Sequence, residues 1–549
     1  MKRTTYFAEM AQPTLYPSQF RFRLQQALKR GETYPMDSLD FILADIEKPK
    51  EYTRAAQMCT TDLSGRYLDF LSLAAPLGLE GFHADRLHQL FDRINKCRNT
   101  TYRIDSTDTY GRMTTAFANY FFYCADQRAY GALLEAAESY RGAAPVDQYM
   151  EADHYESLAH VYAVTHEKAV LDSARGVVLP ESLHGLHSHG TLNALRGLQL
   201  MTMYSGDISF SDKVEPYRRE ILSRYEYPDG CVSEYFPSSM LNEGCTISDW
   251  IMTNLNAGFI YGDDEAYAIA ENSLLNAMFF NQTIYGGFGH KGLSPNGYHS
   301  GDYTEAWWCC LSNCGRCMTD LASHIVTRRP DGIHVNFLIP GKYVLNGAEV
   351  EIITGYPTRA DAIITVSGSG EVHIRIPGCI VRPGLTCETN ADGVRTFRLS
   401  GKMGYHTVSF ERENARMLCY GPLILAPSIN RLRPRDEYRK QAILTGIFND
   451  VKWYDGAGLE NIEKSRCSLV LPKADEDGLI PLKYAGHGGW IYYDEGTNNR
   501  DYIDPVSAYV TLQYAGGVRC DMRFYPLSYF SRANVSGEIP FLFTRDDAQ

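Results

Sequence analysis

The sequence predicts a mainly α-helical region followed by β-rich regions: an (α/α)6 barrel with antiparallel β-sandwiches behind it. Up to about residue 325, apolar side chains recur at the i, i+3, i+4 spacing that is typical of amphipathic helices. After Arg329-Pro330-Asp331-Gly332, apolar and polar residues alternate, which is typical of half-buried strands. About a dozen helices with short connections suit a ring of helical hairpins. An open solenoid would tend to show a repeat of fixed period, and the sequence has none.

The predicted helices are short and separated by turn residues. In the segment 129–141, for example, Leu133, Leu134 and Ala137 share one face of the helix. The helices are expected at residues 20–30, 37–45, 64–76, 84–96, 110–124, 129–141, 154–164, 168–176, 190–205, 211–225, 246–259, 265–280 and 313–326.

Strands are expected only after the helices. They cover residues 333–339, 348–354, 361–366, 372–377 and 394–399, and 508–512 in a Gly-rich C-terminal part. Gly, Pro or Asn between them favours antiparallel pairing. We therefore predict three domains: the barrel at 1–327, a β-sandwich at 328–430 and a second β-rich domain at 431–549. A length of 549 residues fits this number, since domains average roughly 150 residues.

The composition excludes several classes of protein. With 44% hydrophobic and 22% charged residues, the chain is neither disordered nor fibrous. Its formal charge of −13 argues against nucleic acid as a partner, because phosphate binding needs clustered Lys and Arg. No run approaches the roughly 18 apolar residues of a membrane-spanning helix, so no membrane partner is expected.

The N-terminal sequence and the cysteines bear on the compartment. The chain begins with basic residues but lacks the apolar stretch of a secretory signal. We therefore expect the reducing cytoplasm, or the periplasm if a signal peptide has been trimmed. In a reducing compartment, the 14 Cys residues indicate metal binding, catalysis or buried thiols rather than disulfides.

Two short segments carry the most informative side chains. One holds Glu243 and Cys245, and the other holds the adjacent Cys309 and Cys310. A carboxylate and three thiolates are ligands that tetrahedral Zn²⁺ accepts. The alternative from the residues alone is that these are small, buried side chains at helix starts, because free Cys is often buried.

A second zinc site can be tested by helix geometry. Cys310, Cys314 and Cys317 follow i, i+4, i+7 spacing and would lie on one helix face. They would span two helical turns, roughly 10 Å at 1.5 Å per residue, which is too far for one ion. This face is therefore expected to be buried core.

The two segments together resemble a known enzyme family. Glu243-Gly244-Cys245, followed by Cys309-Cys310 with Asn313 and Arg316 after it, is similar to glycoside hydrolase family 127, the β-L-arabinofuranosidases. The family has Pro-Pro where this chain has Leu311-Ser312. Weaker similarities lie at 188–190, 331–340 and 421–423, and the resemblance covers residues 62–426.

The resemblance implies a retaining glycosidase on an (α/α)6 barrel. In the family, the counterparts of Glu243, Cys245, Cys309 and Cys310 hold zinc, and the counterpart of Cys309 is the nucleophile. These residues are thus the expected Zn²⁺ ligands, and Cys309 is the expected catalytic thiolate.

The resemblance also implies a separate glutamate as the acid/base. The position that family spacing indicates is Tyr227, which cannot transfer the proton. Glu234 fits the local pattern, because an aromatic residue follows it at the expected place, if the connecting loop is shorter. Glu226 is the alternative. The acid/base must be protonated at rest, so its pKa should be raised by burial or by the anionic cluster.

Five further residues are expected at the substrate. His189 corresponds to a His that binds a sugar hydroxyl in the family, and Trp308 could form a wall for the sugar ring. Asp153 and His154 stand where the family has a sugar-binding His, and His290 stands near a Phe-Tyr of the family. These departures suggest a related furanose that is branched or carboxylated, such as one from a pectic side chain.

Several interpretations compete with this one. Glu243 could be the nucleophile, with Cys309 only binding metal. Within the fold, an unsaturated-uronide hydrolase would need acid residues but no zinc–thiolate set. A third hypothesis is a non-catalytic carbohydrate-binding protein with structural zinc. The expected partner is an oligosaccharide substrate, and a homodimer is left open.

Overall fold

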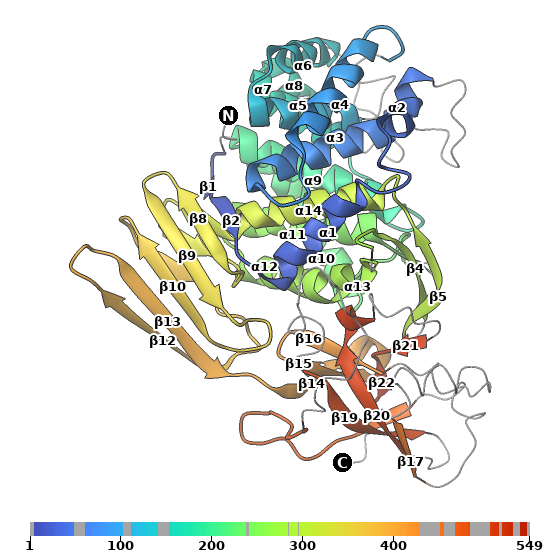
Figure 1. Ribbon diagram of the computed structural model, residues 1–549, viewed down its shortest axis with the longest axis vertical. Helices are drawn as coiled ribbons and strands as arrows, with labels where there is room; N and C mark the ends of the chain where they lie inside the picture. Colours follow the sequence, from blue (N-terminus) through green and yellow to red (C-terminus); the bar gives the residue numbers. More distant parts are fainter. Residues whose placement is uncertain are drawn as a thin grey trace.

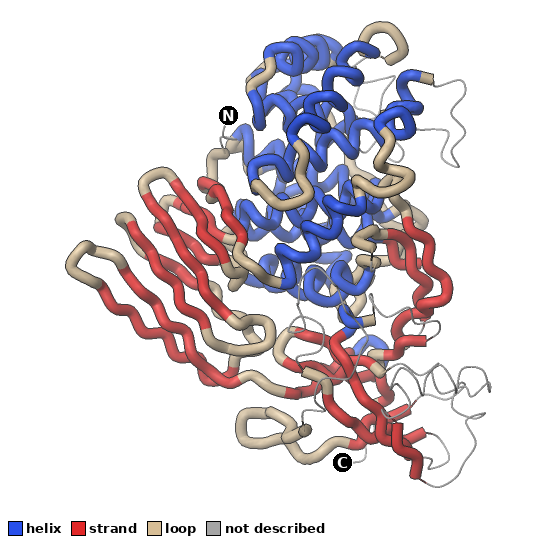
Figure 2. The backbone as a smooth tube through the Cα atoms, in the orientation of Figure 1, coloured by secondary structure: helices blue, strands red, loops and turns tan. Residues whose placement is uncertain are grey.

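The computed structural model describes twelve stretches of the chain. They are residues 5–48, 61–102, 111–140, 153–237, 241–283, 285–294, 296–427, 451–454, 467–483, 506–514, 519–530 and 538–545. Helices occupy the upper part of the molecule in Figure 1, and sheets lie beside and below them. Figure 2 shows the same separation of helices from strands.

A closed ring of inner helices forms the helical domain. The inner helices are α3 (Asp62–Ala74), α5 (Gly111–Cys124), α7 (Asp153–Thr165), α9 (Ser188–Ser205), α11 (Gly244–Tyr261) and α14 (Cys310–His324). Each packs on the next in this order, and α14 packs back on α3. This closure confirms the predicted barrel over an open solenoid.

A second layer of helices covers the outside of the ring. They are α1 (Gln19–Arg30), α2 (Leu39–Glu47), α4 (Ala84–Cys97), α6 (Gln127–Ser139), α8 (Lys168–Arg175), α10 (Ser209–Arg224) and α12 (Asp264–Asn272). Helix α1 packs on α14, α4 on α3, α6 on α5 and α7, α8 on α7 and α9, α10 on α9, and α12 on α11. Short helical turns add η1 (Ala75–Leu77), η2 (Ser273–Met278) and α13 (Phe279–Asn281).

The two layers differ in how their helices are buried. Outer helix α4 buries Leu87, Leu90, Phe91 and Ile94, one face at the i, i+3, i+4, i+7 spacing. Inner helix α11, in contrast, is buried at nearly every position, including polar residues such as Asp249. The interior of the ring is therefore lined by polar side chains that need partners from neighbouring helices.

Two sheets form the first β region beside the helices (Figure 1). The larger has the order β12 (Val381–Thr389), β13 (Arg395–Lys402), β10 (Ala362–Ser367), β9 (Ala348–Thr354), β8 (Gly341–Leu345) and β2 (Gln12–Leu15). The smaller has the order β1 (Glu9–Met10), β6 (Val326–Arg329), β7 (Gly332–Val335) and β11 (Val372–Ile374). Pairing in these two sheets is antiparallel except between β7 and β11, which run parallel.

The described C-terminal strands form a third sheet. It contains β14 (Tyr405–Phe410), β15 (Ala415–Tyr420), β16 (Leu423–Ala426), β17 (Val451–Tyr454), β18 (Cys467–Val470), β19 (Ala508–Tyr514), β20 (Arg519–Pro526) and β22 (Phe543–Thr544). Short 3-10 turns lie at η3 (Glu411–Glu413) and η8 (Leu527–Tyr529). Because β16 pairs with β20, this sheet joins strands from both sides of residue 430.

The N-terminal strands were not expected from the sequence. Strand β1 pairs with β6, and β2 pairs with β8, so residues 9–15 belong to the sheets and not to the ring. The domain limits at 327 and 430 stay predictions. The pairing of β2 with β8 crosses the limit at 327, and the pairing of β16 with β20 crosses the limit at 430. Among the described residues, no helix is long and apolar enough to cross a membrane.

A fourth sheet lies beside the ring (Figure 1). Its order is β21 (Glu538–Pro540), β5 (Gly297–Glu305), β4 (Gly289–Ser294) and β3 (Leu241–Glu243). Strand β3 leads directly into α11, and β5 ends shortly before α14. This sheet therefore fixes the starts of two neighbouring inner helices.

Candidate active site

The predicted metal ligands lie at the N-termini of α11 and α14. Glu243 is the N-cap residue of α11, and Cys245 is the second residue of that helix. Cys309 is the N-cap residue of α14, and Cys310 begins the helix. Because α11 and α14 pack against each other, both pairs meet. The positive ends of the two helix dipoles favour anionic side chains here.

The distances show that the cysteines form one cluster. Cys310 Sγ lies 3.5 Å from Cys245 Sγ and 3.6 Å from Cys309 Sγ. Ligand atoms of Glu243, Cys309, Cys310 and His290 all lie within 4.8 Å of one another. Cys245, Cys310 and Glu243 are buried, whereas Cys309 is partly exposed. Cys309 is therefore the most accessible of the three thiols in the cluster.

The thiols of this cluster differ in acidity. Hydrogen bonds from Cys245 and Cys310, followed by one from His290, hold the pKa of Cys309 well below its ordinary value. Burial raises the pKa values of Cys245 and Cys310. Of the three thiols, Cys309 is thus the one that its surroundings favour to ionise, and the thiolate is the nucleophilic form of cysteine.

The donor set fits zinc. Three sulfurs and a carboxylate oxygen are ligands of tetrahedral Zn²⁺, and the described cysteines are all free thiols. Because burial raises the pKa values of Cys245 and Cys310, a bound cation would stabilise their ionised form. His290, expected at the substrate, lies among these ligands because β3 and β4 pair Glu243 with His290.

Glu234 lies next to this cluster. Its Oε1 is 3.9 Å from His290 Nδ1, and it groups within 4.8 Å with His187 and Glu243. The backbone holds it in place: its N–H donates to the Leu241 carbonyl at 3.1 Å, and its own carbonyl accepts from Ser188 at 2.8 Å. Glu234 is therefore positioned by β3 on one side and by the start of α9 on the other.

Glu226, the alternative acid/base, occupies a different environment. Its Oε1 accepts a hydrogen bond from Trp250 Nε1 at 2.9 Å. Burial raises the pKa of Glu226 to about 8, and the nearby Asp229 adds to this increase. The raised pKa is a property expected of an acid/base, but the contacts of Glu226 connect it to Trp250 and not to the cysteines.

His189 lies in the polar interior of the ring. Its Nδ1 donates to Asp249 of α11, and its Nε2 accepts from Arg66 at 3.3 Å and from Arg112 at 3.4 Å. The side chain is almost fully buried, with 8% of the residue exposed. Partners on three other helices therefore hold this ring in place, with its centroid 5.8 Å from that of His187.

Of the remaining residues expected at the substrate, the structure describes the side chain of Trp308 but not those of Asp153 and His154. Asp153 and His154 begin α7, and their side chains lie outside the described part of the chain. Trp308 directly precedes Cys309 and is partly exposed. Its ring and that of Trp307 are nearly perpendicular with centroids 5.1 Å apart, so part of Trp308 packs against its neighbour.

The structure adds His187, Arg66 and Asp249 to the residues expected at the site from the sequence. His187 is the N-cap residue of α9, and its Nε2 lies 3.5 Å from Glu243 Oε2. Although burial opposes it, hydrogen bonding to Glu243 raises the pKa of His187. One usable signal was spacing, because Asp249 follows Cys245 by one helical turn and shares its face.

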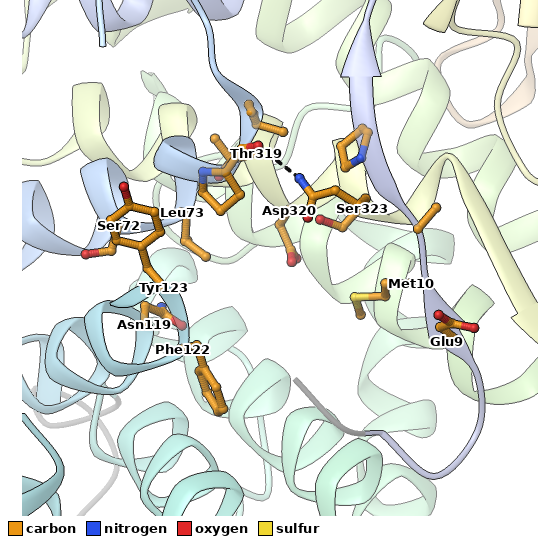
Figure 3. Close-up of a pocket in the computed structure, with 15 residues that line it drawn as sticks. Glu9, Met10, Ser72, Leu73, Asn119, Phe122, Tyr123, Thr319, Asp320 and Ser323 are labelled. Atoms are coloured by element: carbon orange, nitrogen blue, oxygen red, sulfur yellow. Dashed lines mark hydrogen bonds between the residues drawn. The ribbon is translucent and has the colours of Figure 1, made fainter. Parts of the chain in front are cut away.

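A separate cavity lies farther along α14 (Figure 3). It has a volume of about 530 Å³, and its lining includes Ser72, Asn119, Tyr123 and Asp320 from the later parts of α3, α5 and α14. Asp320 is ten residues beyond Cys310, roughly 15 Å along the helix. This cavity is thus distinct from the cysteine cluster.

The fold of the chain is shared with known glycoside hydrolases. No family model and no curated protein matches the sequence. A solved structure described as the GH127 β-arabinofuranosidase BT3674 has a TM-score of 0.70 at 13% identity, covering 100% of this chain and 99% of that one. A GH127 β-L-arabinofuranosidase from Geobacillus stearothermophilus T6 has a TM-score of 0.68 at 13% identity, covering 97% and 100%.

These matches extend over the barrel and the β regions together. A third structure, described as a glycoside hydrolase, matches with a TM-score of 0.65 at 13% identity and covers 98% of each chain. The resemblance seen in the two short segments is thereby confirmed at the level of the fold. Over its whole length, the chain has the fold of the family 127 β-L-arabinofuranosidases.

Proposed function

We propose that the protein is a zinc-dependent, retaining glycoside hydrolase that releases a terminal β-L-arabinofuranose or a related furanose, branched or acidic, from plant-type oligosaccharides. The observation that carries this proposal is the meeting of Cys309, Cys310 and Glu243 at two helix N-termini, beside Glu234. The fold shared with β-L-arabinofuranosidases supports it.

The cluster supplies a nucleophile. Glu243, Cys245, Cys309 and Cys310 would hold Zn²⁺, which would keep the thiols ionised and offset part of their negative charge. The Cys309 thiolate attacks the anomeric carbon, forming a carbon–sulfur bond while the bond to the leaving oxygen breaks. Glu234 donates its proton to that oxygen, so the aglycone leaves as a neutral alcohol.

The second step reverses these roles. Glu234, now a carboxylate, takes a proton from water as the water oxygen attacks the anomeric carbon. The carbon–sulfur bond breaks, and Cys309 regains its electron pair. Two displacements at the same carbon return the original configuration, so the sugar is released with retention.

The polar interior suits a hydroxyl-rich substrate. Both ring nitrogens of His189 are engaged by Asp249, Arg66 and Arg112, so a sugar hydroxyl would bind this ring by replacing an arginine at Nε2. His290 reaches toward both Glu234 and the cysteines. Since this His stands where the family has an aromatic pair, it is the residue through which a different furanose would be selected.

The proposal is tested by hydrolysis of an aryl β-L-arabinofuranoside. Cys309→Ala and Glu234→Gln should each lower kcat/KM by roughly 10³-fold or more, with near-UV circular dichroism unchanged. Cys317→Ala is the matched control, because this buried thiol lies farther along α14 and should leave activity within a few-fold. Full activity of Cys309→Ala would overturn the proposal.

A further inference from the structure

A second group of potential metal ligands lies in the β region. His334 is on β7, His373 is on the neighbouring strand β11, and Asp331 is in the turn between β6 and β7. Ligand atoms of the three side chains lie within 4.8 Å of one another. The group shares no residue with the cysteine cluster.

Strand pairing places the two histidines side by side. In the parallel pairing of β7 with β11, His373 is the direct partner of His334. Their rings stack with centroids 4.4 Å apart and an interplanar angle of 22°. The two imidazoles therefore project side by side from the same face of the sheet.

Asp331 completes the group at the ring nitrogens. Its Oδ1 lies 3.0 Å from His334 Nε2, and its carbonyl oxygen lies 3.5 Å from His373 Nε2. Asp331 sits in a two-residue turn after Pro330, between the paired residues Arg329 and Gly332. Proline fixes the backbone of such a turn, so the carboxylate is held near both rings before any ion binds.

We propose that Asp331, His334 and His373 form a second Zn²⁺ site, separate from the catalytic cluster. Two imidazoles and one carboxylate are ligands of three-residue zinc sites, in which water completes the coordination. The side chain of Asp331 is 61% exposed, which leaves a path for the ion and for water.

The charges around the group are compatible with a cation. Glu371 Oε2 lies 3.9 Å from His373 Nε2 and adds a second carboxylate at the exposed side. Arg329 of the same hairpin is close enough for its charge to act on His334, but it donates to the Phe259 carbonyl at the end of α11. Its guanidinium is thus directed toward the helix. A bound ion would join β7, β11 and the turn at the corner nearest the helical ring.

The test is the number and affinity of zinc ions per chain, measured by equilibrium dialysis against Zn²⁺ and elemental mass spectrometry. The full chain should bind one zinc ion more than His373→Asn or His334→Asn. Losing an outer-shell partner lowers metal affinity roughly 10- to 100-fold. Losing a ligand should lower the zinc affinity of this site by at least that factor. His406→Asn is the control, since this His lies on β14 outside the group.

A third variant and a spectroscopic probe distinguish this zinc ion from one bound by the cysteines. Asp331→Asn changes only an exposed turn side chain, so it should weaken the same zinc ion without affecting folding. Co²⁺ in this site should lack the sulfur charge-transfer absorption that thiolate ligands give, which separates it from the cysteine cluster. Equal zinc content and affinity in the full chain, His373→Asn and Asp331→Asn would overturn the proposal.

Discussion

Buried charged side chains from several inner helices meet inside the helical ring. Glu156 of α7 forms ion pairs with three arginines: Arg112 at 3.4 Å, Arg316 at 2.7 Å, and Arg196. All four side chains are buried. Although burial opposes it, attraction to the arginines holds the pKa of Glu156 well below its ordinary value. One carboxylate therefore balances charge contributed by three helices.

Removing that carboxylate should be costly. Glu156→Gln would remove the carboxylate that the three arginines share, although Asp69 still pairs with Arg316 and Asp249 with Arg196. Removing one partner of a buried ion pair costs roughly 3–5 kcal/mol of unfolding free energy. Glu135→Gln is the matched control, because Glu135 pairs with Arg98 at the surface and should cost less than about 1 kcal/mol. Urea unfolding measures both changes, and equal losses would contradict the role of Glu156.

Glu226→Gln separates the two acid/base candidates. The amide keeps an acceptor for Trp250, so activity should stay within a few-fold if Glu234 transfers the proton. Loss of activity in Glu226→Gln, matching that of Glu234→Gln, would instead identify Glu226 as the acid/base.

Glu226→Gln should also change how the free energy of unfolding depends on pH. Folded Glu226 keeps its proton up to about pH 8, whereas the unfolded chain releases it near the ordinary value of 4.5. Between these values unfolding releases a proton, so this group lowers stability as pH rises, by up to about 1.4 kcal/mol per pH unit. Glu226→Gln should be more stable than wild type at pH 8, and the difference should shrink toward pH 5. A pH-independent difference in urea unfolding would contradict the buried, protonated state.

At the scale of the elements, close helix packing depends on glycine. A Cβ at Gly197 of α9 would lie 2.4 Å from the Tyr155 carbonyl carbon of α7, closer than Cβ atoms approach backbone. Gly197→Ala should therefore push these inner helices apart and cost roughly 1–3 kcal/mol. Gly131→Ala is the control: it lies in outer helix α6 with open space around it, so it should gain up to about 1 kcal/mol. Stabilisation by both substitutions would contradict the packing of α7 on α9.

The helix starts show where prediction from sequence is weakest. The predicted segment 84–96 matches α4, Ala84–Cys97, because its apolar face is regular. Helices α11 and α14 were predicted to begin at 246 and 313, but they begin at Gly244 and Cys310. Glu243 and Cys309 make no side-chain capping hydrogen bond at these starts. The usual cap signal is absent where residues of the candidate site take the cap positions.

Over the whole molecule, local patterns predicted most helices and strands, but not the long-range pairings. The motif around Cys309 led to the cysteine cluster, whereas the place of His290 depends on β3 pairing with β4 across a Gly-rich segment. Likewise, residues 9–15 carry no strong strand signal, and their partners β6 and β8 lie more than 300 residues later. Such pairings depend on tertiary context and cannot be read from periodicity.

The central claim is that Cys309 bonds to the sugar. The most direct measurement is peptide mass spectrometry after treatment with a mechanism-based β-L-arabinofuranoside inactivator. One glycosyl adduct per chain is expected on Cys309, and none in Cys309→Ala. An adduct on Glu243, or hydrolysis with inversion at the anomeric carbon, would contradict it.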